Sequence, residues 1–513
     1  MNRLLARGLW LLGLALTAWA DPATLAPVGL FTDSMVLQRD AAVPVWGTAA
    51  PGDQVTVTFA GQTKTATADA SGQWRVKLDP LPASAEPREL VLRTARESRT
   101  LKDVVVGDVW LCSGQSNMAY RMGQLPNTAA DVAASSNPSV RFYRVAEKFS
   151  QQPVAQVAGE WQRVSPATTE NCSAVAYYFA QALQRELKIP IGLLVSAIGG
   201  TRIETRMPHD VLTELGLTER LLEKWAKVPA AEFERLIEDY RTYQNYTYKI
   251  RPEELRVAKA QGVEPPPERP RPAMRGHDCP SALHNGMIAP LQPFALRGVI
   301  WYQGESNVGN AATYARLQRA LLAEWRRVWG AELPFYFVQL APHKTANPAF
   351  REAQFRAWES TPHTAMVVTT DYGDAENIHP TRRRPVGERL AAAAFALTYG
   401  RAVAYSGPVF RAMHLDGSRA VLSFDHLGGG LVAKGDKLEG FTLAGADGKF
   451  VAAEAQIVGD TVVVTARGVA EPKNVRFGWA TVPKVNLFNR AGFPAVPFRT
   501  DRPARATPDE KAE

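Results

Sequence analysis

The alternation of apolar and polar positions predicts three consecutive regions in this chain. Over residues 21–103, short runs of alternating apolar and polar side chains are separated by turns rich in Gly, Pro and Asp, which predicts an N-terminal β-sandwich. The same pattern returns over 401–502 and predicts a C-terminal β-sandwich. Between them, over 104–400, continuous apolar runs alternate with helical segments. This middle region is therefore expected to be an α/β domain with buried strands.

A charged helical segment interrupts the middle region at about 205–280. Its apolar residues recur at helical spacing, and Glu264–Pro272 is so rich in proline that we expect it to be extended. Such an insertion either shapes a substrate cleft or is a surface elaboration. Several of its aromatic residues are suited to stacking on sugars, although such rings more often pack within the protein; they are Trp225, Tyr240, Tyr243, Tyr246 and Tyr248.

Residues 1–20 have the pattern of a secretory signal peptide. Arg3 and Arg7 precede the apolar run Leu9–Leu16, and small residues up to Ala20 suit cleavage. The apolar run is too short to span a membrane, so we expect cleavage near Ala20 and an exported protein, periplasmic or secreted, without membrane association. Residues 503–513 are polar and are expected to be disordered.

Composition argues against several other classes. The formal charge is +8, or about +6 without Arg3 and Arg7, and no basic cluster is interleaved with aromatics, so nucleic acid is not an expected partner. Three cysteines permit at most one disulfide; Cys172–Cys279 is one pairing, whereas Cys112 lies in a predicted buried strand. No zinc-binding spacing, phosphate loop or dinucleotide fingerprint is present, so we expect no metal and no cofactor. The sequence does not specify the oligomeric state.

Ser116 is the candidate nucleophile. An apolar run that ends at Leu111 predicts a strand, and Gly114 then permits a sharp turn into the segment Gln115–Asn117. A serine at such a strand-to-helix turn exposes its hydroxyl where α/β sheets bind ligands. The alternative is a serine that only caps the next helix.

His379 is the candidate general base for Ser116. It follows another predicted strand, Met366–Thr370, and Glu376 is placed to hold the imidazole in the correct tautomer. Asp374 competes with Glu376 for that role, and a Ser-His dyad supported by a backbone carbonyl is a third arrangement.

Two further strand ends supply candidate oxyanion donors. The run from Ile191 ends in Gly199 and Gly200, whose backbone N–H groups can face a developing oxyanion. The run from Gly298 ends before Gln303 and Asn307, either of which carries a side-chain amide for the same purpose.

The segments GQSNM, SAIGGTRIE, WYQGESN and NIHP resemble the four blocks of the SGNH-type esterases, in the sialate O-acetylesterase branch and its plant-polysaccharide acetylesterase relatives. The resemblance implies a three-layer α/β/α SGNH-hydrolase domain that removes acetyl groups from sugar hydroxyls. It implies Ser116 as nucleophile, His379 as base, and the Ser116 N–H, Gly199 or Gly200, and Gln303 as oxyanion donors. The family has Asp where this chain has Glu376. Asn117, Arg202 and Asn307 are candidate substrate-binding residues.

Three functions fit these observations. The first is an acetylesterase for plant-cell-wall oligosaccharides such as xylan or xyloglucan fragments. The second is a sialate O-acetylesterase, which needs a cation such as Arg202 or Arg382 for the substrate carboxylate. The third is a non-catalytic carbohydrate-binding protein with two β modules. The presence of both Ser116 and His379 favours an enzyme, and because loop arginines are more often structural, we favour neutral glycans.

Overall fold

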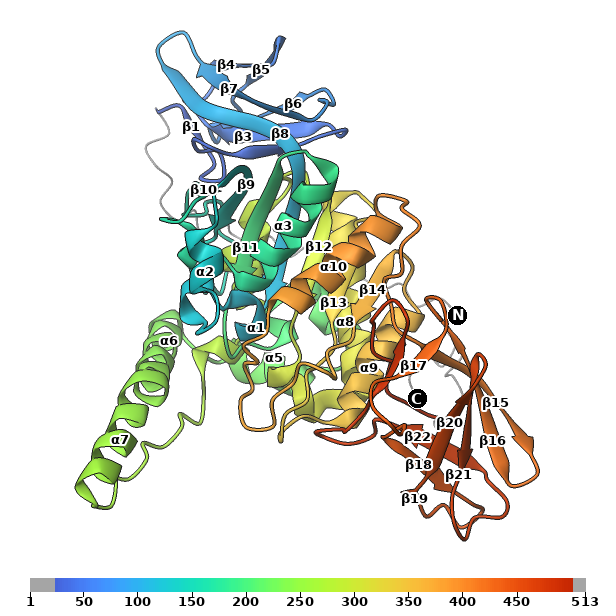
Figure 1. The fold of residues 1–513 in the computed structure, drawn as a ribbon. Coiled ribbons are helices and arrows are strands. Elements are labelled where there is room, and N and C mark those ends of the chain that lie inside the picture. Colours follow the sequence, from blue (N-terminus) through green and yellow to red (C-terminus); the bar gives the residue numbers. More distant parts are fainter. Residues whose placement is uncertain (1–23, 502–513) are drawn as a thin grey trace, which may run out of the picture.

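The computed structural model describes residues 24–501 and contains three parts in chain order: an N-terminal β domain, a central α/β domain and a C-terminal β domain (Figure 1). The predicted fold class is confirmed, since a parallel sheet between helices is flanked by antiparallel sheets at both ends. Residues 1–20 and 503–513, for which a signal peptide and a disordered tail are predicted, lie outside the described residues.

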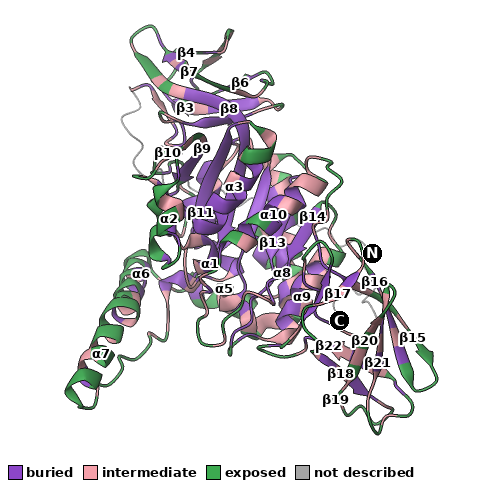
Figure 2. Cartoon of the chain, viewed as in Figure 1, coloured by how far each residue is buried: buried purple, intermediate pink, exposed green. Residues whose placement is uncertain are grey.

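The central sheet has the strand order β10-β9-β11-β8-β12-β13-β14. All neighbours are parallel except β10, which pairs antiparallel with β9 at one edge. The strands are β8 (Ser98–Gly114), β9 (Asn137–Arg144), β10 (Trp161–Val164), β11 (Ile191–Ala197), β12 (Gly298–Tyr302), β13 (Phe335–Val338) and β14 (Thr364–Val367). Strands β11 to β14 are buried on both faces, as their continuous apolar runs predict (Figure 2).

Two pairs of helices cover this sheet. On one face, α3 (Ala174–Leu187) and α10 (Arg384–Leu397) pack on strand residues such as Cys112 and Ile300. On the other face, α8 (Ala311–Trp329) and α9 (Pro348–Glu359) pack on residues such as Trp301. Successive strand residues point to opposite faces, so each apolar strand contributes to both cores. The short helices α1 (Ser116–Ala119) and α2 (Ala129–Ala133) complete this domain.

Strand β8 joins the N-terminal domain to the central domain without a break. Its first half pairs with β7 and β2, and its second half pairs with β11 and β12. The predicted boundary at 103/104 therefore falls inside one continuous strand. The other N-terminal strands are β1 (Ala26–Pro27), β2 (Val36–Gln38), β3 (Val43–Thr48), β4 (Gln54–Phe59), β5 (Gln62–Thr67), β6 (Gln73–Leu78) and β7 (Ser84–Arg93).

The C-terminal domain is built from two four-stranded antiparallel sheets, β15-β16-β21-β20 and β19-β18-β22-β24, with the pair β17-β23 beside them. Leu422, Val464 and Phe477 belong to their shared core. The strands are β15 (Val409–Asp416), β16 (Arg419–Asp425), β17 (Leu431–Ala433), β18 (Phe441–Ala444), β19 (Val451–Ala452), β20 (Glu454–Val458), β21 (Thr461–Thr465), β22 (Asn474–Phe477), β23 (Leu487–Asn489) and β24 (Phe498–Arg499).

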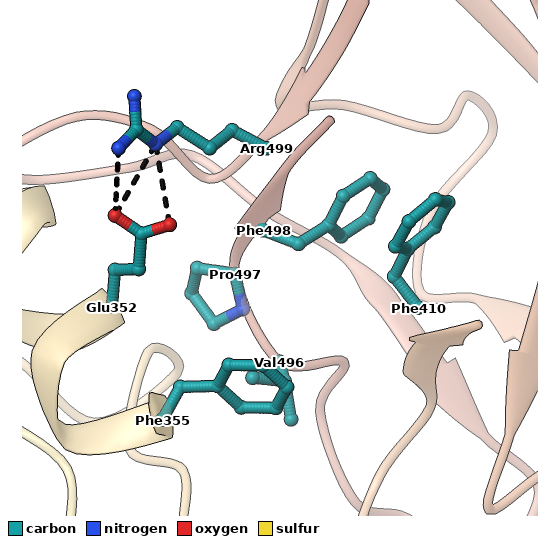
Figure 3. A pocket seen from close by; sticks show the side chains of 7 residues that line it. All are labelled: Glu352, Phe355, Phe410, Val496, Pro497, Phe498 and Arg499. Carbon is teal, nitrogen blue, oxygen red and sulfur yellow. Dashed lines mark hydrogen bonds and ion pairs between the residues drawn. The ribbon is translucent and has the colours of Figure 1, made fainter. Parts of the chain in front are cut away.

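Side chains of helix α9 in the central domain contact the C-terminal domain. Arg499 donates to Glu352 at 3.0 Å, and Phe355, Phe410 and Phe498 line a small cavity beside this ion pair (Figure 3). Buried Arg351 donates to the backbone carbonyls of Ala480 and Thr481 at 2.7 Å each. These contacts fix the C-terminal domain against the α/β domain.

The insertion forms a projecting arm (Figure 1). Its helices are α4 (His209–Leu215), α5 (Glu219–Ala226), α6 (Ala230–Asn245) and α7 (Arg251–Gln261), and a π-helical turn over Tyr246–Ile250 joins the last two. Most of α7 is exposed (Figure 2). Among the predicted sugar-stacking residues, Trp225, Tyr240 and Tyr246 are buried, whereas Tyr248 is exposed.

All three cysteines are free and buried, so the Cys172–Cys279 bridge does not form in this structure. The reason is location: Cys172 packs in the core under α3, and Cys279 packs in the core on the other side of the sheet. Within residues 24–501, no helix has the length and apolar character needed to cross a membrane.

Candidate active site

The site lies at the carboxyl ends of the central strands. Strand β8 ends at Gly114, where a φ of 136° and the Tyr302 carbonyl oxygen, only 2.1 Å from where a Cβ would lie, leave room for glycine alone. Ser116 then opens α1, and its Oγ lies 2.9 Å from Nε2 of His379. His379 lies in the loop between β14 and α10. The fold therefore brings the predicted nucleophile and the predicted base together, although they are far apart in the sequence. A serine hydroxyl at this distance can transfer its proton to the imidazole.

The other ring nitrogen of His379 faces Tyr120. The Tyr120 hydroxyl lies 3.3 Å from Nδ1, and the two ring centroids are 4.6 Å apart. When Nε2 accepts the Ser116 proton, Nδ1 carries a hydrogen and donates it to the Tyr120 oxygen. The side chain that faces Nδ1 of the base is therefore a tyrosine at the C-cap of α1, the short helix that begins with the nucleophile.

Glu376, the predicted partner of His379, lies elsewhere. Its carboxylate accepts from Lys344 Nζ at 2.7 Å, and its side chain is 75% exposed. Asp374 caps its own loop by accepting from the backbone N–H groups of Glu376 and Asn377. Neither carboxylate hydrogen-bonds to the ring in this structure, and the assignment of Glu376 as the triad acid stays a prediction. The carboxylates point to solvent because the loop turns back on itself between Asp374 and His379.

The electrostatic environment keeps His379 neutral. Burial lowers its pKa to about 4, and the positive charges of Arg383 and His343 add to the shift. In an ordinary Ser-His-acid triad, a buried carboxylate stabilises the imidazolium and so raises the pKa of the histidine. At neutral pH His379 is thus a free base ready to accept a proton.

The predicted oxyanion glycines adjoin Ser116. A Cβ on Gly199 would lie 3.3 Å from the Ser116 Cβ, so the backbone at this position approaches the nucleophile closely. Gly200 has a φ of 71°, a left-handed conformation that favours glycine. Among the described residues, none accepts a hydrogen bond from the backbone N–H of Ser116, Gly199 or Gly200. These donors are free to bind an oxyanion.

Gln303 has a different role from the predicted one. Its amide nitrogen donates to the Thr201 carbonyl at 3.2 Å and to Asn307 Oδ1 at 2.7 Å, which uses both amide hydrogens. Its carbonyl oxygen accepts from the Tyr314 hydroxyl at 2.6 Å. Gln303 is therefore a buried support for the glycine loop and not an oxyanion donor in this structure.

Asn307 belongs to the same support. It is fully buried, accepts from the Ile203 N–H at 3.0 Å and donates to Glu204 at 2.8 Å. Arg206, also buried, donates to Thr201 Oγ1 at 2.8 Å. The side chain of Asn307 is enclosed by these protein partners in this structure, and its predicted contact with substrate stays a prediction.

Asn117 links the two catalytic loops. Its amide nitrogen donates to Glu305 and to the Ile378 carbonyl at 3.2 Å, and its carbonyl oxygen accepts from Arg383 at 2.7 Å. Asn117 is 1% exposed and holds the loop of His379, and its predicted role in substrate binding stays a prediction. Burial raises the pKa of Glu305, although hydrogen bonds and the charge of Arg383 oppose that shift.

Arg202, the remaining predicted substrate contact, lies near two carboxylates. Its guanidinium is 4.0 Å from Glu204 and 3.8 Å from Asp278, and its side chain is 30% exposed. Within residues 24–501, no cluster of His, Cys, Asp and Glu is arranged to hold a metal ion.

Neither Tyr120 nor Arg383 was predicted as a site residue, although the position of each in the sequence indicates that it lies near the catalytic residues. Tyr120 follows Ser116 by four residues, the spacing that places side chains on one face of a helix. Arg383 follows His379 by four residues in a run of three arginines that reads as a solvated helix start. The structure buries it to 2% exposure.

A serine hydroxyl hydrogen-bonded to histidine at the strand ends of an α/β sheet, next to free backbone N–H groups, defines a serine hydrolase. Residues 106–237 and 281–396 match the family model described as carbohydrate esterase, sialic acid-specific acetylesterase. The chain therefore belongs to the sialic acid-specific acetylesterase family, and it is a carbohydrate acetylesterase.

Individual relatives agree with this membership. The chain is 31% identical over 429 residues to sialate O-acetylesterase of Rattus norvegicus, covering 74% of this chain and 75% of that protein. It is 30% identical over 466 residues to sialate O-acetylesterase of Homo sapiens, covering 80% and 79%. The crystal structure of a carbohydrate acetylesterase from Xanthomonas citri matches with a TM-score of 0.79 at 35% identity, covering 93% of this chain and 100% of that chain. The non-catalytic alternative is set aside.

Proposed function

We propose that this enzyme hydrolyses O-acetyl groups on plant-cell-wall oligosaccharides, such as xyloglucan or xylan fragments, through an acetyl-serine intermediate. The observation that carries the chemistry is the 2.9 Å hydrogen bond between Ser116 Oγ and His379 Nε2. Family membership supports an acetylated carbohydrate as the substrate. The side chains around the site bear on which sugar carries the acetyl group.

In the first step, Ser116 Oγ attacks the acetyl carbonyl carbon while its proton passes to His379 Nε2. The carbonyl oxygen becomes an oxyanion, which the N–H groups of Ser116 and of Gly199 or Gly200 stabilise. One such donor typically contributes ~3 kcal/mol to transition-state stabilisation. The intermediate collapses, the bond to the sugar oxygen breaks, and that oxygen takes the proton from His379.

In the second step, water attacks the acetyl-serine carbonyl and gives a proton to His379. The same donors stabilise the second oxyanion, acetate leaves, and Ser116 regains its proton from His379. Tyr120 accepts the Nδ1 hydrogen throughout, so the ring keeps one tautomer while Nε2 gains and loses a proton.

The arginines near the site favour a neutral sugar. A sialate carboxylate needs a cation with no other partner, but Arg202 lies beside Glu204 and Asp278. Arg382 lies over the Tyr372 ring at 4.5 Å. These protein groups offset part of each charge, so both arginines attract a substrate carboxylate less than an isolated arginine would, although the buried Nε of Arg202 has no hydrogen-bond partner.

Acetate release by the purified protein tests the proposal. The panel is acetylated xylan, acetylated xyloglucan oligosaccharides, 9-O-acetyl sialic acid and 4-nitrophenyl acetate, each with the wild type and Ser116→Ala. The proposal expects release from a plant oligosaccharide that is lost in the variant. Release from acetylated sialic acid alone, with loss of that activity in Arg202→Ala, would establish the sialate alternative instead.

We also propose that the enzyme is exported to the periplasm or secreted. The pattern of residues 1–20 supports this, since a short apolar run follows two arginines. Cell fractionation with amino-terminal sequencing tests it. A mature amino terminus near Asp21 in the exported fraction is expected, and an intact Met1 on cytoplasmic protein would contradict it.

A further inference from the structure

The inserted arm is anchored beside the active site. Tyr240 of α6 is buried, and its ring packs on His277 with centroids 4.5 Å apart. Arg275 donates to the Tyr240 hydroxyl at 3.4 Å. A Cβ on Gly200 would lie 3.0 Å from the same hydroxyl, so α6 packs directly on the oxyanion loop. The base of the arm therefore has a fixed position relative to Ser116.

The turn after α6 brings Tyr248 to the catalytic histidine. The Tyr248 and His379 ring centroids are 6.5 Å apart with their planes inclined at 58°. Protein atoms around the hydroxyl raise the pKa of Tyr248, Tyr240 and Tyr120 raise it further, and Arg271 lowers it. The residue as a whole nevertheless remains largely open to solvent.

Tyr248 is unusual in its exposure. At 62% it is the most exposed large hydrophobic residue among residues 24–501, and the other members of that exposed group are aliphatic. An exposed ring whose centroid lies 6.5 Å from that of the catalytic histidine offers a flat surface that a ligand bound at the site can cover. The apolar C–H face of a pyranose ring is such a ligand, because tyrosine combines a flat apolar surface with a polar hydroxyl.

We propose that Tyr248 is a sugar-binding platform of the active site, on which a pyranose ring of the acetylated oligosaccharide stacks while its acetyl group reaches Ser116. This inference rests on the proposed function and names the residue that selects a carbohydrate ester over a simple acetate ester. The insertion thus contributes to specificity, and the chemistry remains with Ser116 and His379.

The test compares two substrates in three variants. For Tyr248→Ala, kcat/KM on acetylated xyloglucan oligosaccharides is expected to fall about tenfold, the loss of one aromatic contact. On 4-nitrophenyl acetate it is expected to stay within about twofold, because that ester lacks the sugar. Tyr248→Trp should retain most activity on the oligosaccharide. Leu255→Ala, which removes an exposed apolar side chain farther along the same arm, is the matched control and should match the wild type.

The possible outcomes separate the two proposals. If Tyr248→Ala leaves the oligosaccharide reaction unchanged, or lowers both reactions equally, the platform is overturned and the proposed function stands. If the wild type cleaves only 4-nitrophenyl acetate, both are overturned. Binding of the oligosaccharide to Ser116→Ala by calorimetry gives a reading independent of catalysis, and adding Tyr248→Ala should weaken that binding about tenfold.

Discussion

The Tyr120 hydroxyl and Nδ1 of His379 are 3.3 Å apart, at the ring nitrogen that a carboxylate occupies in a Ser-His-acid triad. Tyr120 is the C-cap of α1, which begins at Ser116, so one short helix fixes the nucleophile at its start and the group that orients the base directly after its end. A neutral hydroxyl stabilises an imidazolium less than a carboxylate does. Several expectations about rate, pH and stability follow from this difference.

Replacing Tyr120 by Phe removes the acceptor for the Nδ1 hydrogen and keeps the ring stacked on His379. A neutral hydrogen bond contributes about 0.5–1.5 kcal/mol, so kcat should fall by up to roughly tenfold with the fold intact. Steady-state kinetics on 4-nitrophenyl acetate, with circular dichroism for folding, measure this. Unchanged kcat in folded Tyr120→Phe would show that the hydroxyl does not support the base.

Replacing Glu376 by Gln should leave kcat within about twofold of wild type, because the exposed carboxylate pairs only with Lys344. Asp374→Asn serves as the parallel variant, since Asp374 binds backbone N–H groups of its own loop. Rates of both variants on the same ester check the assignment. A collapse of kcat in Glu376→Gln alone would instead establish that residue as the triad acid.

The low pKa of His379 predicts activity at acidic pH. Only the neutral ring accepts the Ser116 proton, so kcat/KM should decline as the pH falls through the pKa of about 4. The plateau should extend well below the ordinary histidine value of 6.5. A profile of kcat/KM between about pH 3 and 8 measures it. An acid limb centred near the ordinary value would mean that a negative charge offsets the burial of His379.

Gly199→Ala should lower kcat by at least roughly tenfold, since the added Cβ approaches Ser116 and disturbs a donor for the oxyanion. Gly309→Ala is the matched control, because a Cβ there meets no atom within 4 Å. Both variants are compared by kcat and by thermal unfolding. Equal kcat in the two would remove Gly199 from the catalytic site.

Asn117→Ala tests the link between the two catalytic loops. It leaves the buried guanidinium of Arg383 without its acceptor, so the free energy of unfolding should fall by about 1–3 kcal/mol. Urea denaturation measures this, with exposed Asn245→Ala as a control that should not lose stability. If Asn117→Ala is as stable as the control, the network does not tie the loops together.

Much of the fold was predictable because it depends on apolar runs. Strands such as Gly298–Tyr302 are buried on both faces and read as continuous apolar segments, and parallel strands bring their carboxyl ends to one edge. Ser116 and His379 were therefore expected to meet although 263 positions separate them. The predicted boundary at 103/104 falls within β8 because this strand is polar in its first half and apolar in its second, which reads as two elements.

The details of the site were less predictable because the spacing of residues along the chain does not determine the direction in which their side chains point. Glu376 and Asp374 have the right separation from His379, but the loop turns their carboxylates toward solvent. The sequence does not show whether the amide of Gln303 has partners, whereas in the structure both of its amide hydrogens are donated to neighbouring groups. Tyr248 was one of five aromatic residues in the insertion suited to sugar stacking, and only the fold shows that it is the one whose ring lies beside His379.

The central claim is that Ser116 carries the acetyl group between the two steps. Mass spectrometry of the enzyme quenched during turnover of 4-nitrophenyl acetate and of acetylated xyloglucan oligosaccharides tests this most directly. The account predicts one added acetyl group on the peptide that contains Ser116, absent from Ser116→Ala and removed as substrate is exhausted. Full turnover with the acetyl group on another residue, or turnover that persists in Ser116→Ala, would contradict it.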